Sequence, residues 1–185
     1  TYGKVNVALS VTLPEPENVH SLARSYTDSE IKNVDVLVFD EDGKFMERVK
    51  VDGGELTPSG TEISFSIRLD ATSKRRVIHL VTNGRSPDGV TDRLNFNDIT
   101  SGMLESAAIP ALGTTAMIFG SLEDQVMPLI MWGRVELPTG INIVTKADGV
   151  KLLRVAACVQ VKKGVGDATN GFKVLRWIKD LIVVT

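Results

Sequence analysis

Apolar and polar residues alternate along much of the chain, and this period of two is typical of β-strands that bury one face. The pattern is clearest in residues 4–13 and 62–69, which we predict to be strands. Proline at positions 14 and 16 ends the first segment, because proline cannot donate a hydrogen bond to a neighbouring strand. The apolar face of residues 4–13 consists of Val5, Val7, Leu9, Val11 and Leu13.

Two other segments are apolar almost without interruption. Residues 31–39 form such a run, which is typical of a central strand covered on both faces. Residues 76–82 are rich in β-branched side chains and end at Asn83-Gly84, which predicts another strand. Between these two segments, Asp42-Gly43 precedes residues 44–51, and Asp-Gly between two β-segments predicts a hairpin.

The later half of the chain predicts shorter elements. A helix is expected at residues 97–104, with Asn97 or Asp98 as its N-cap. Asp148-Gly149 is expected to turn the chain into a strand at residues 150–163. The shared face of that strand would carry Leu153, Val155, Ala157, Val159 and Val161. Further strands are expected at residues 115–120, 127–137, 141–143 and 172–185.

Together these segments predict an all-β fold of about seven to ten short strands, with a short helix or irregular insertion. Alternation favours antiparallel sheets with one solvated face. The 185 residues are 43% apolar and 24% charged, which suits one sizeable core. The formal net charge is −2, and no basic stripe supports nucleic acid as a partner.

Candidate catalytic groups are few. His20 lies in a polar connection and is interpreted as solvated, while His79 alternates with apolar residues and is interpreted as a buried strand histidine. Cys158 is the only cysteine and lies in an apolar run, which favours a small buried side chain. No nucleophile elbow, zinc motif or phosphate loop is present. No catalytic, cofactor or metal site is therefore predicted, and the chain is not expected to be an enzyme.

Three further features of the sequence are interpreted as structural. The acidic turn at residues 40–43 has Val51 where a calcium loop needs a bidentate Glu, so we interpret it as a hairpin turn. Arg154 lies in an apolar strand, either as an outward charge or with a carboxylate or carbonyl partner. Trp132 and Trp177 are interpreted as packing residues rather than ligand platforms.

The order of several segments points to a family. An apolar strand and a polar loop are followed by a strand, turn and strand at residues 34–45, and by residues 77–83, which end in Asn83. Met127-Pro128 and the segment 130–133 come next, and a Leu-Arg-x-x-Ala strand stands at residues 153–157. This order resembles the N-terminal domain of the fimbrillin pilins of Bacteroides-like bacteria.

The resemblance implies a transthyretin-like β-sandwich over residues 1–170. Residues 171–185 would be a closing strand or the start of a linker to a second, largely absent β-domain. Family members are exported to the outer membrane as lipoproteins and stand at the cell surface in fimbriae. A membrane would be a partner only through an N-terminal lipid anchor that is not present in this chain.

The resemblance also implies assembly by strand exchange. In the family a protease cuts after an arginine behind the first strand, and a strand from the next subunit fills the groove. Arg24 is the only arginine before Ile31, so cleavage is expected between Arg24 and Ser25, with residues 4–13 as the removable strand. The chain would be a stalk, tip or anchor subunit, with other fimbrial subunits as its partners.

Two other function classes stay open. A surface β-sandwich could instead bind carbohydrate, host proteins or other bacteria. An aromatic content of 5% counts against a sugar platform, because sugars usually stack on exposed rings. A hydrolase on a β-scaffold has no supporting constellation of residues.

Overall fold

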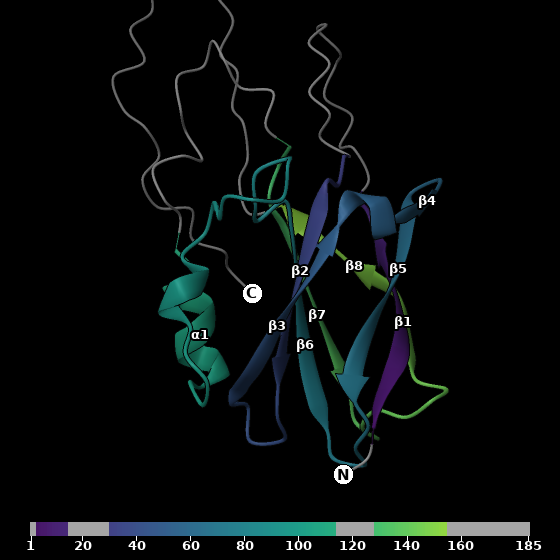
Figure 1. The fold of residues 1–185 in the computed structure, drawn as a ribbon, viewed down its shortest axis with the longest axis vertical. Helices are drawn as coiled ribbons and strands as arrows, with labels where there is room; N and C mark the ends of the chain where they lie inside the picture. The colour runs from purple at the N-terminus through teal and green to yellow at the C-terminus, as the bar shows by residue number, and fades with distance from the viewer. Residues whose placement is uncertain (1–2, 15–29, 114–127, 155–185) are drawn as a thin grey trace, which may run out of the picture. The chain divides into compact units, whose positions relative to one another are not determined.

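A computed structural model describes residues 3–14, 30–113 and 128–154, and these form two facing β-sheets (Figure 1). In chain order the strands are β1 (Lys4–Thr12), β2 (Asn33–Phe39), β3 (Phe45–Asp52), β4 (Thr57–Ser59), β5 (Glu62–Asp70), β6 (Arg76–Thr82), β7 (Met131–Leu137), β8 (Lys146–Lys151) and β9 (Leu153–Arg154). The helical elements are η1 (Gly53–Glu55), η2 (Phe96–Asp98) and α1 (Glu105–Ala111).

The strands divide into a first sheet of order β4-β5-β1-β8 and a second sheet of order β3-β2-β6-β7-β9. Every neighbouring pair is antiparallel except β1 and β8, which run parallel. The predicted all-β sandwich is therefore confirmed. The parallel pair departs from the purely antiparallel expectation. After β7 the chain crosses from the second sheet to the first, and β8 then runs beside β1 in the same direction.

The main core lies between the two sheets. The alternating strands β1 and β5 each contribute one face to it, and their apolar residues are buried as the alternation predicted. The two faces meet side chains from β2, β6 and β7 of the second sheet. The core members from β1 and β5 are Val7, Leu9, Val11, Ile63, Phe65, Ile67 and Leu69.

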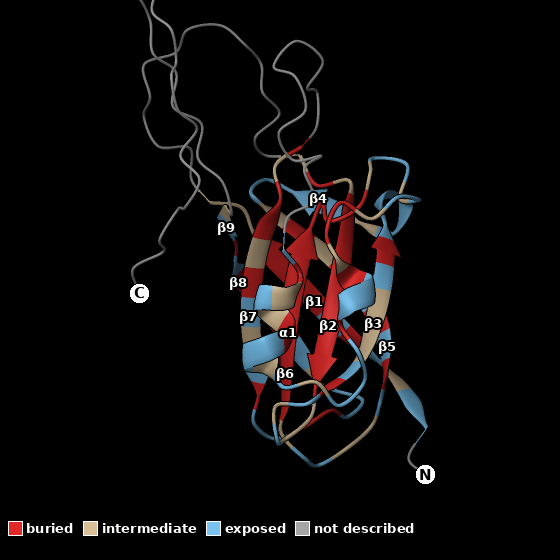
Figure 2. Cartoon of the chain, turned by 90° about the vertical axis from the view of Figure 1, so that its left-hand side faces the viewer, coloured by how far each residue is buried: buried red, intermediate tan, exposed pale blue. Residues whose placement is uncertain are grey.

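A second apolar cluster covers the outer face of the second sheet. Figure 2 shows α1 in front of this sheet, and the segment around α1 packs Leu94, Phe96 and Ala108 onto it. All seven residues of β2 and all seven of β6 are consequently buried. This outer layer explains why both strands are apolar almost continuously, whereas β1 and β5 alternate.

The predicted helix at residues 97–104 is wrong. Gly102 has a φ of +82°, which interrupts a helix, and its N–H donates to the carbonyl oxygen of Phe45 at 2.8 Å. The N–H of Phe45 in turn donates to Met103 at 2.8 Å. The backbone here therefore pairs with the start of β3, and α1 begins only at Glu105.

Two predicted features near residue 145 also differ. Residues 141–143 form no strand, because Ile141 pairs only with Thr72 and the Asn142 side chain then accepts the N–H of Val144 at 2.9 Å, which turns the chain. Asp148-Gly149 is not a turn before a strand. It lies inside β8, where it forms a bulge opposite β1.

The inward face predicted for residues 150–163 is offset by one residue from the buried face in the structure. Leu152 is buried and Leu153 is 57% exposed. The chain leaves the first sheet after β8 and joins the second as β9, so the alternation shifts by one residue at Leu152. The chain divides into units Thr1–Val155 and Ala156–Thr185, and the second unit lies outside the described residues. The predicted strands at 115–120 and 172–185 and the boundary at residue 170 lie outside them as well.

A substitution at Gly140 tests how closely its backbone packs against the segment at Thr72. Its φ is +79°, and a Cβ atom there would lie 2.1 Å from the carbonyl oxygen of Thr72. We expect Gly140→Ala to lower the free energy of unfolding by about 3 kcal/mol, because strain and a backbone clash combine. Gly60→Ala is the control, since Gly60 has a φ of +62° with no atom near its added Cβ. The control should lose about 1 kcal/mol in urea denaturation, and equal losses would contradict the clash.

Candidate functional site

Strand β1 lies in the middle of the first sheet, between β5 and β8 (Figure 1). We call the space that β1 fills between these two strands the β1 slot. It pairs with β5 over its whole length, from Lys4 opposite Asp70 to Thr12 opposite Glu62. On its other side it pairs with β8, from Ala8 opposite Lys146 to Thr12 opposite Lys151. The first segment of the chain is thus an internal strand with hydrogen-bonded neighbours on both sides.

The inward side chains of β1 form part of the main core. Val7, Leu9 and Val11 are at most 1% exposed, and Val5 and Leu13 are partly buried against the same cluster. The predicted inward face is therefore confirmed. Burying three aliphatic side chains of this size contributes roughly 5 to 9 kcal/mol. A sandwich without β1 would expose an apolar groove of matching size.

The outward face of β1 holds a residue that the alternation did not single out. Ser10 belongs to the solvent-facing set, yet it is only 4% exposed. Its hydroxyl donates to the Glu62 carboxylate on β5 and accepts the N–H of Gly149 on β8 at 2.7 Å. Ser10 therefore ties β1 to both neighbours, and only the pairing of distant strands could have revealed it.

Backbone bonds continue beyond the end of β1. The N–H of Leu13 donates to Thr61 at 2.9 Å, and the N–H of Leu152 donates to Thr12 at 3.1 Å. Arg154 is half-buried, and its Nη2 lies 3.5 Å from the carbonyl oxygen of Pro14. Of the two interpretations of Arg154, an outward charge or a side chain with a partner, the structure favours the one with a carbonyl partner. Arg24 and Ser25 lie outside the described residues, so cleavage between them stays a prediction.

Asn83 connects the end of β6 to the residues that precede β2 and β7. Its side-chain Nδ2 donates to the carbonyl oxygens of Glu30 at 2.9 Å and Leu129 at 2.7 Å, and its Oδ1 accepts the N–H of Lys32 at 2.8 Å. Its φ of +56° turns the end of β6 so that all three contacts can form. Arg93 donates to the Asn83 carbonyl oxygen at 2.9 Å. Asn83 thus connects segments that lie far apart in the sequence.

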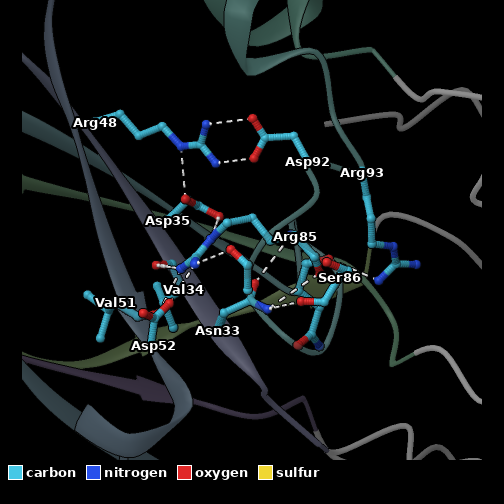
Figure 3. A network of polar contacts seen from close by, with 12 residues as sticks. Asn33, Val34, Asp35, Arg48, Val51, Asp52, Arg85, Ser86, Asp92 and Arg93 are labelled. Carbon is cyan, nitrogen blue, oxygen red and sulfur yellow. Dashed lines mark hydrogen bonds and ion pairs between the residues drawn. The ribbon is translucent and has the colours of Figure 1, made fainter.

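Buried Arg85 lies beside Asn83 and organises a polar network (Figure 3). Its guanidinium contacts Asp35 at 3.2 Å and Asp52 at 2.6 Å, and it also donates to the carbonyl oxygens of Val51 and Gly89. Arg85 is 1% exposed and Asp35 is fully buried. Such a pair is tolerated in a core only because its hydrogen bonds are satisfied.

Arg48 extends the network to the surface loop at Asp92. Its Nε donates to Asp35 at 2.9 Å, and its two terminal nitrogens form a bidentate pair with Asp92 at 2.6 and 3.0 Å (Figure 3). The hydrogen bonds from Arg48 lower the pKa of Asp92. The guanidinium carbon also lies 3.5 Å from the centroid of the Phe96 ring. The charge cluster thereby fastens the η2 segment onto β3.

A second cluster surrounds His79 under the outer layer. Trp132 donates its indole N–H to His79 Nδ1 at 2.9 Å, and Nε2 of His79 lies 2.9 Å from the Glu105 carboxylate. Because an indole N–H can only donate, the imidazole is neutral with its proton on Nε2. Burial lowers the pKa of His79. Both residues are thus packing and tethering groups for α1, as the sequence interpretation of His79 and Trp132 held.

The described residues offer little for chemistry beyond these contacts. Within them, no three His, Cys, Asp or Glu side chains are grouped so that they could hold a metal ion. The acidic turn is a hairpin turn, in which Asp40 accepts the N–H groups of Asp42 and Lys44. No helix in the described part of the chain has the length and apolarity to cross a membrane. His20, Cys158 and Trp177 lie outside the described residues.

Comparison with known proteins identifies a family. A family model described as fimbrillin-A associated anchor proteins Mfa1 and Mfa2 matches residues 3–149. A search of curated proteins found no significant match.

Several solved structures resemble the chain. A protein from Parabacteroides distasonis provisionally assigned to cell adhesion has a TM-score of 0.50 at 15% identity, over 83% of this chain and 41% of that one. A fimbrial assembly protein from the same species has a TM-score of 0.47 at 14% identity, over 82% and 52%. The tip fimbrial protein Mfa3 from Porphyromonas gingivalis has 0.47 at 14%, over 82% and 48%. The first of these supports the fold, and the chain spans about half the length of these proteins or less.

The network at Arg85 predicts a large loss of stability in Arg85→Met, which keeps the apolar stem and removes the charge. We expect the free energy of unfolding to fall by about 3 kcal/mol, because Asp35 keeps its ion pair with Arg48 but loses the one with buried Arg85. Arg75→Met is the control, since Arg75 and Glu136 form an exposed pair. The control should change stability by less than about 0.5 kcal/mol in urea denaturation. Similar losses in both variants would contradict a special role for the network.

Burial of His79 predicts that acid weakens the fold. Because the folded-state pKa lies below the unfolded value of about 6.5, the unfolded chain takes up a proton first as the pH falls. The contribution of His79 is complete above pH about 6.5 and is lost below it, with a slope of at most about 1.4 kcal/mol per pH unit. Urea denaturation between pH 7.5 and 5 should show a smaller decline in His79→Gln. Parallel pH profiles of the two proteins would contradict this account.

Proposed function

The chain belongs to the family of fimbrillin-A associated anchor proteins, and we propose that it is a structural subunit of a surface fimbria that joins its neighbours by strand exchange at the β1 slot. The family is fimbrial and associated with the cell surface. Stalk, tip and anchor positions are all compatible with the proposal, and the partners are other fimbrial subunits. The transthyretin-like topology, the lipid anchor and export to the outer membrane belong to the same proposal.

The internal position of β1 carries this proposal. Removing a central strand leaves two rows of unpaired N–H and C=O groups on β5 and β8, together with an apolar groove. A strand from another subunit satisfies both at once, since its backbone completes the ladders and its apolar side chains fill the groove. A subunit that gives and receives strands makes a head-to-tail contact, and such contacts form filaments when they do not close into a ring.

Covalent attachment explains why exchange would need proteolysis. As long as β1 is joined to the rest of the chain, its effective concentration at the slot exceeds that of any free strand. A cut between Arg24 and Ser25 removes this advantage, although the loop itself lies outside the described residues. The contacts of Asn83 with Glu30 and Lys32 support the proposal, because they hold the start of β2 on the far side of the cut.

The alternative is a surface module that binds carbohydrate or host proteins. Six large apolar side chains are exposed among the described residues, and none of them is aromatic: Met46, Val90, Leu104, Ile143, Val144 and Leu153. Sugar platforms depend on exposed rings, so the described surface favours the structural role.

The proposal predicts that limited trypsin treatment of the full chain cuts between Arg24 and Ser25 and produces a ladder of polymers on non-denaturing electrophoresis. Arg24→Gln should stay monomeric under the same conditions, because the first strand remains attached. N-terminal sequencing of the product locates the cut. If the chain is cut at Arg24 and remains monomeric, or polymerises with residues 1–24 still attached, strand exchange after cleavage is wrong for this protein.

A further inference from the structure

We infer that the β1 slot selects for a hydroxyl: a strand that fills it, whether β1 or a partner's strand, must carry Ser or Thr at the position of Ser10. For the partner's strand this inference rests on the proposed function. Its basis is the bulge in β8, which points the backbone N–H of Gly149 at the strand in the slot, where a side-chain oxygen accepts its hydrogen bond.

The bulge is visible in the register of the two strands. Leu9 lies opposite Ala147 and Val11 lies opposite Val150, so β8 contains one residue more than β1 over this stretch. Asp148 and Gly149 have no partner residue on β1. Gly149 has a φ of +65°, the conformation that a glycine at a bulge readily adopts. The ladder of backbone hydrogen bonds is therefore interrupted beside Ser10.

The hydroxyl of Ser10 replaces the interrupted backbone contact. Its Oγ accepts the Gly149 N–H at 2.7 Å, and its proton is donated to Glu62 on the opposite neighbour. Ser10 itself is 4% exposed, whereas Gly149 lies on the exposed side of β8. Loss of the hydroxyl removes two hydrogen bonds at once, one to each neighbouring strand, and the bond to the Glu62 carboxylate is of the stronger, charge-assisted kind. The hydroxyl requirement belongs to the slot, since both groups that contact Ser10 lie outside β1.

Neighbouring positions show that this requirement is local. Ala8 lies on the same outward face of β1 and is exposed, and no side-chain contact is needed there. Ser10 borders a shallow hollow with Thr57, Ser64 and Asp148, and we expect this hollow to accept the extra methyl group of threonine. The strand that fits the slot therefore has apolar residues at the positions of Val7, Leu9 and Val11, with Ser or Thr between the last two.

The first test uses the intact chain and compares Ser10→Thr with Ser10→Val, which have the same shape and differ in the hydroxyl. Hydrogen exchange at the Gly149 amide, measured by NMR, should be similar to wild type in Ser10→Thr and at least about tenfold faster in Ser10→Val. Ala8→Thr and Ala8→Val form the matched control pair and should not differ. Equal exchange at Gly149 in both Ser10 variants would overturn the inference.

The second test uses the full chain after trypsin has cut it at Arg24. Fluorescent peptides with the sequence of residues 3–14 and Ser, Thr or Val at position 10 compete for the slot, and mass spectrometry follows release of the original fragment. We expect the Ser and Thr peptides to compete at least about tenfold better than the Val peptide.

The outcomes separate the two proposals. Equal uptake of all three peptides overturns hydroxyl selection and leaves strand replacement standing. If no peptide enters the cut protein, strand exchange is overturned. The hydrogen-exchange result at Gly149 would then support the hydroxyl requirement for β1 alone.

Discussion

Strand β1 brings Val7, Leu9 and Val11 into the core from the middle of its sheet, while its backbone completes ladders with β5 and β8 on either side. The sandwich is thus closed by a strand at the start of the chain. A central strand contributes more than an edge strand, because its loss opens two ladders and one groove together. Under the proposed strand exchange, the same geometry that stabilises the subunit would also provide the site that another strand fills.

The charged network lies on elements that do not include β1. Asp35, Arg48, Asp52, Arg85 and Asp92 belong to β2, β3 and the loop after β6, and Asn83 holds the start of β2 to the end of β6. The hydrogen bonds of this network would stay intact if β1 were exchanged. Under the proposed function, the second sheet, with its own apolar outer layer, would remain a stable base while the strand in the slot is exchanged.

The outer layer is attached by apolar packing and by several polar contacts. Leu94, Phe96 and Ala108 cover the second sheet, and Glu105 at the start of α1 reaches both His79 and Arg134. The hydrogen bond from Arg134 lowers the pKa of Glu105, which keeps this carboxylate charged beside the neutral imidazole. This layer covers His79, and Glu105 and Trp132 supply hydrogen-bond partners for its two ring nitrogens.

The sequence by itself indicated the strands β1, β2, β3, β5, β6 and β7 and which faces of β1 and β5 are buried, because alternation reports burial residue by residue. It also indicated the family, through the order of its segments. Tertiary structure alone decided that β8 runs parallel to β1, that α1 begins at Glu105, and that Asp35 pairs with Arg85. Ser10 is the clearest case, since its alternation places it in solvent and its partner Gly149 lies 139 residues away. Local pattern cannot report such contacts, because they depend on which distant strands become neighbours and in what register.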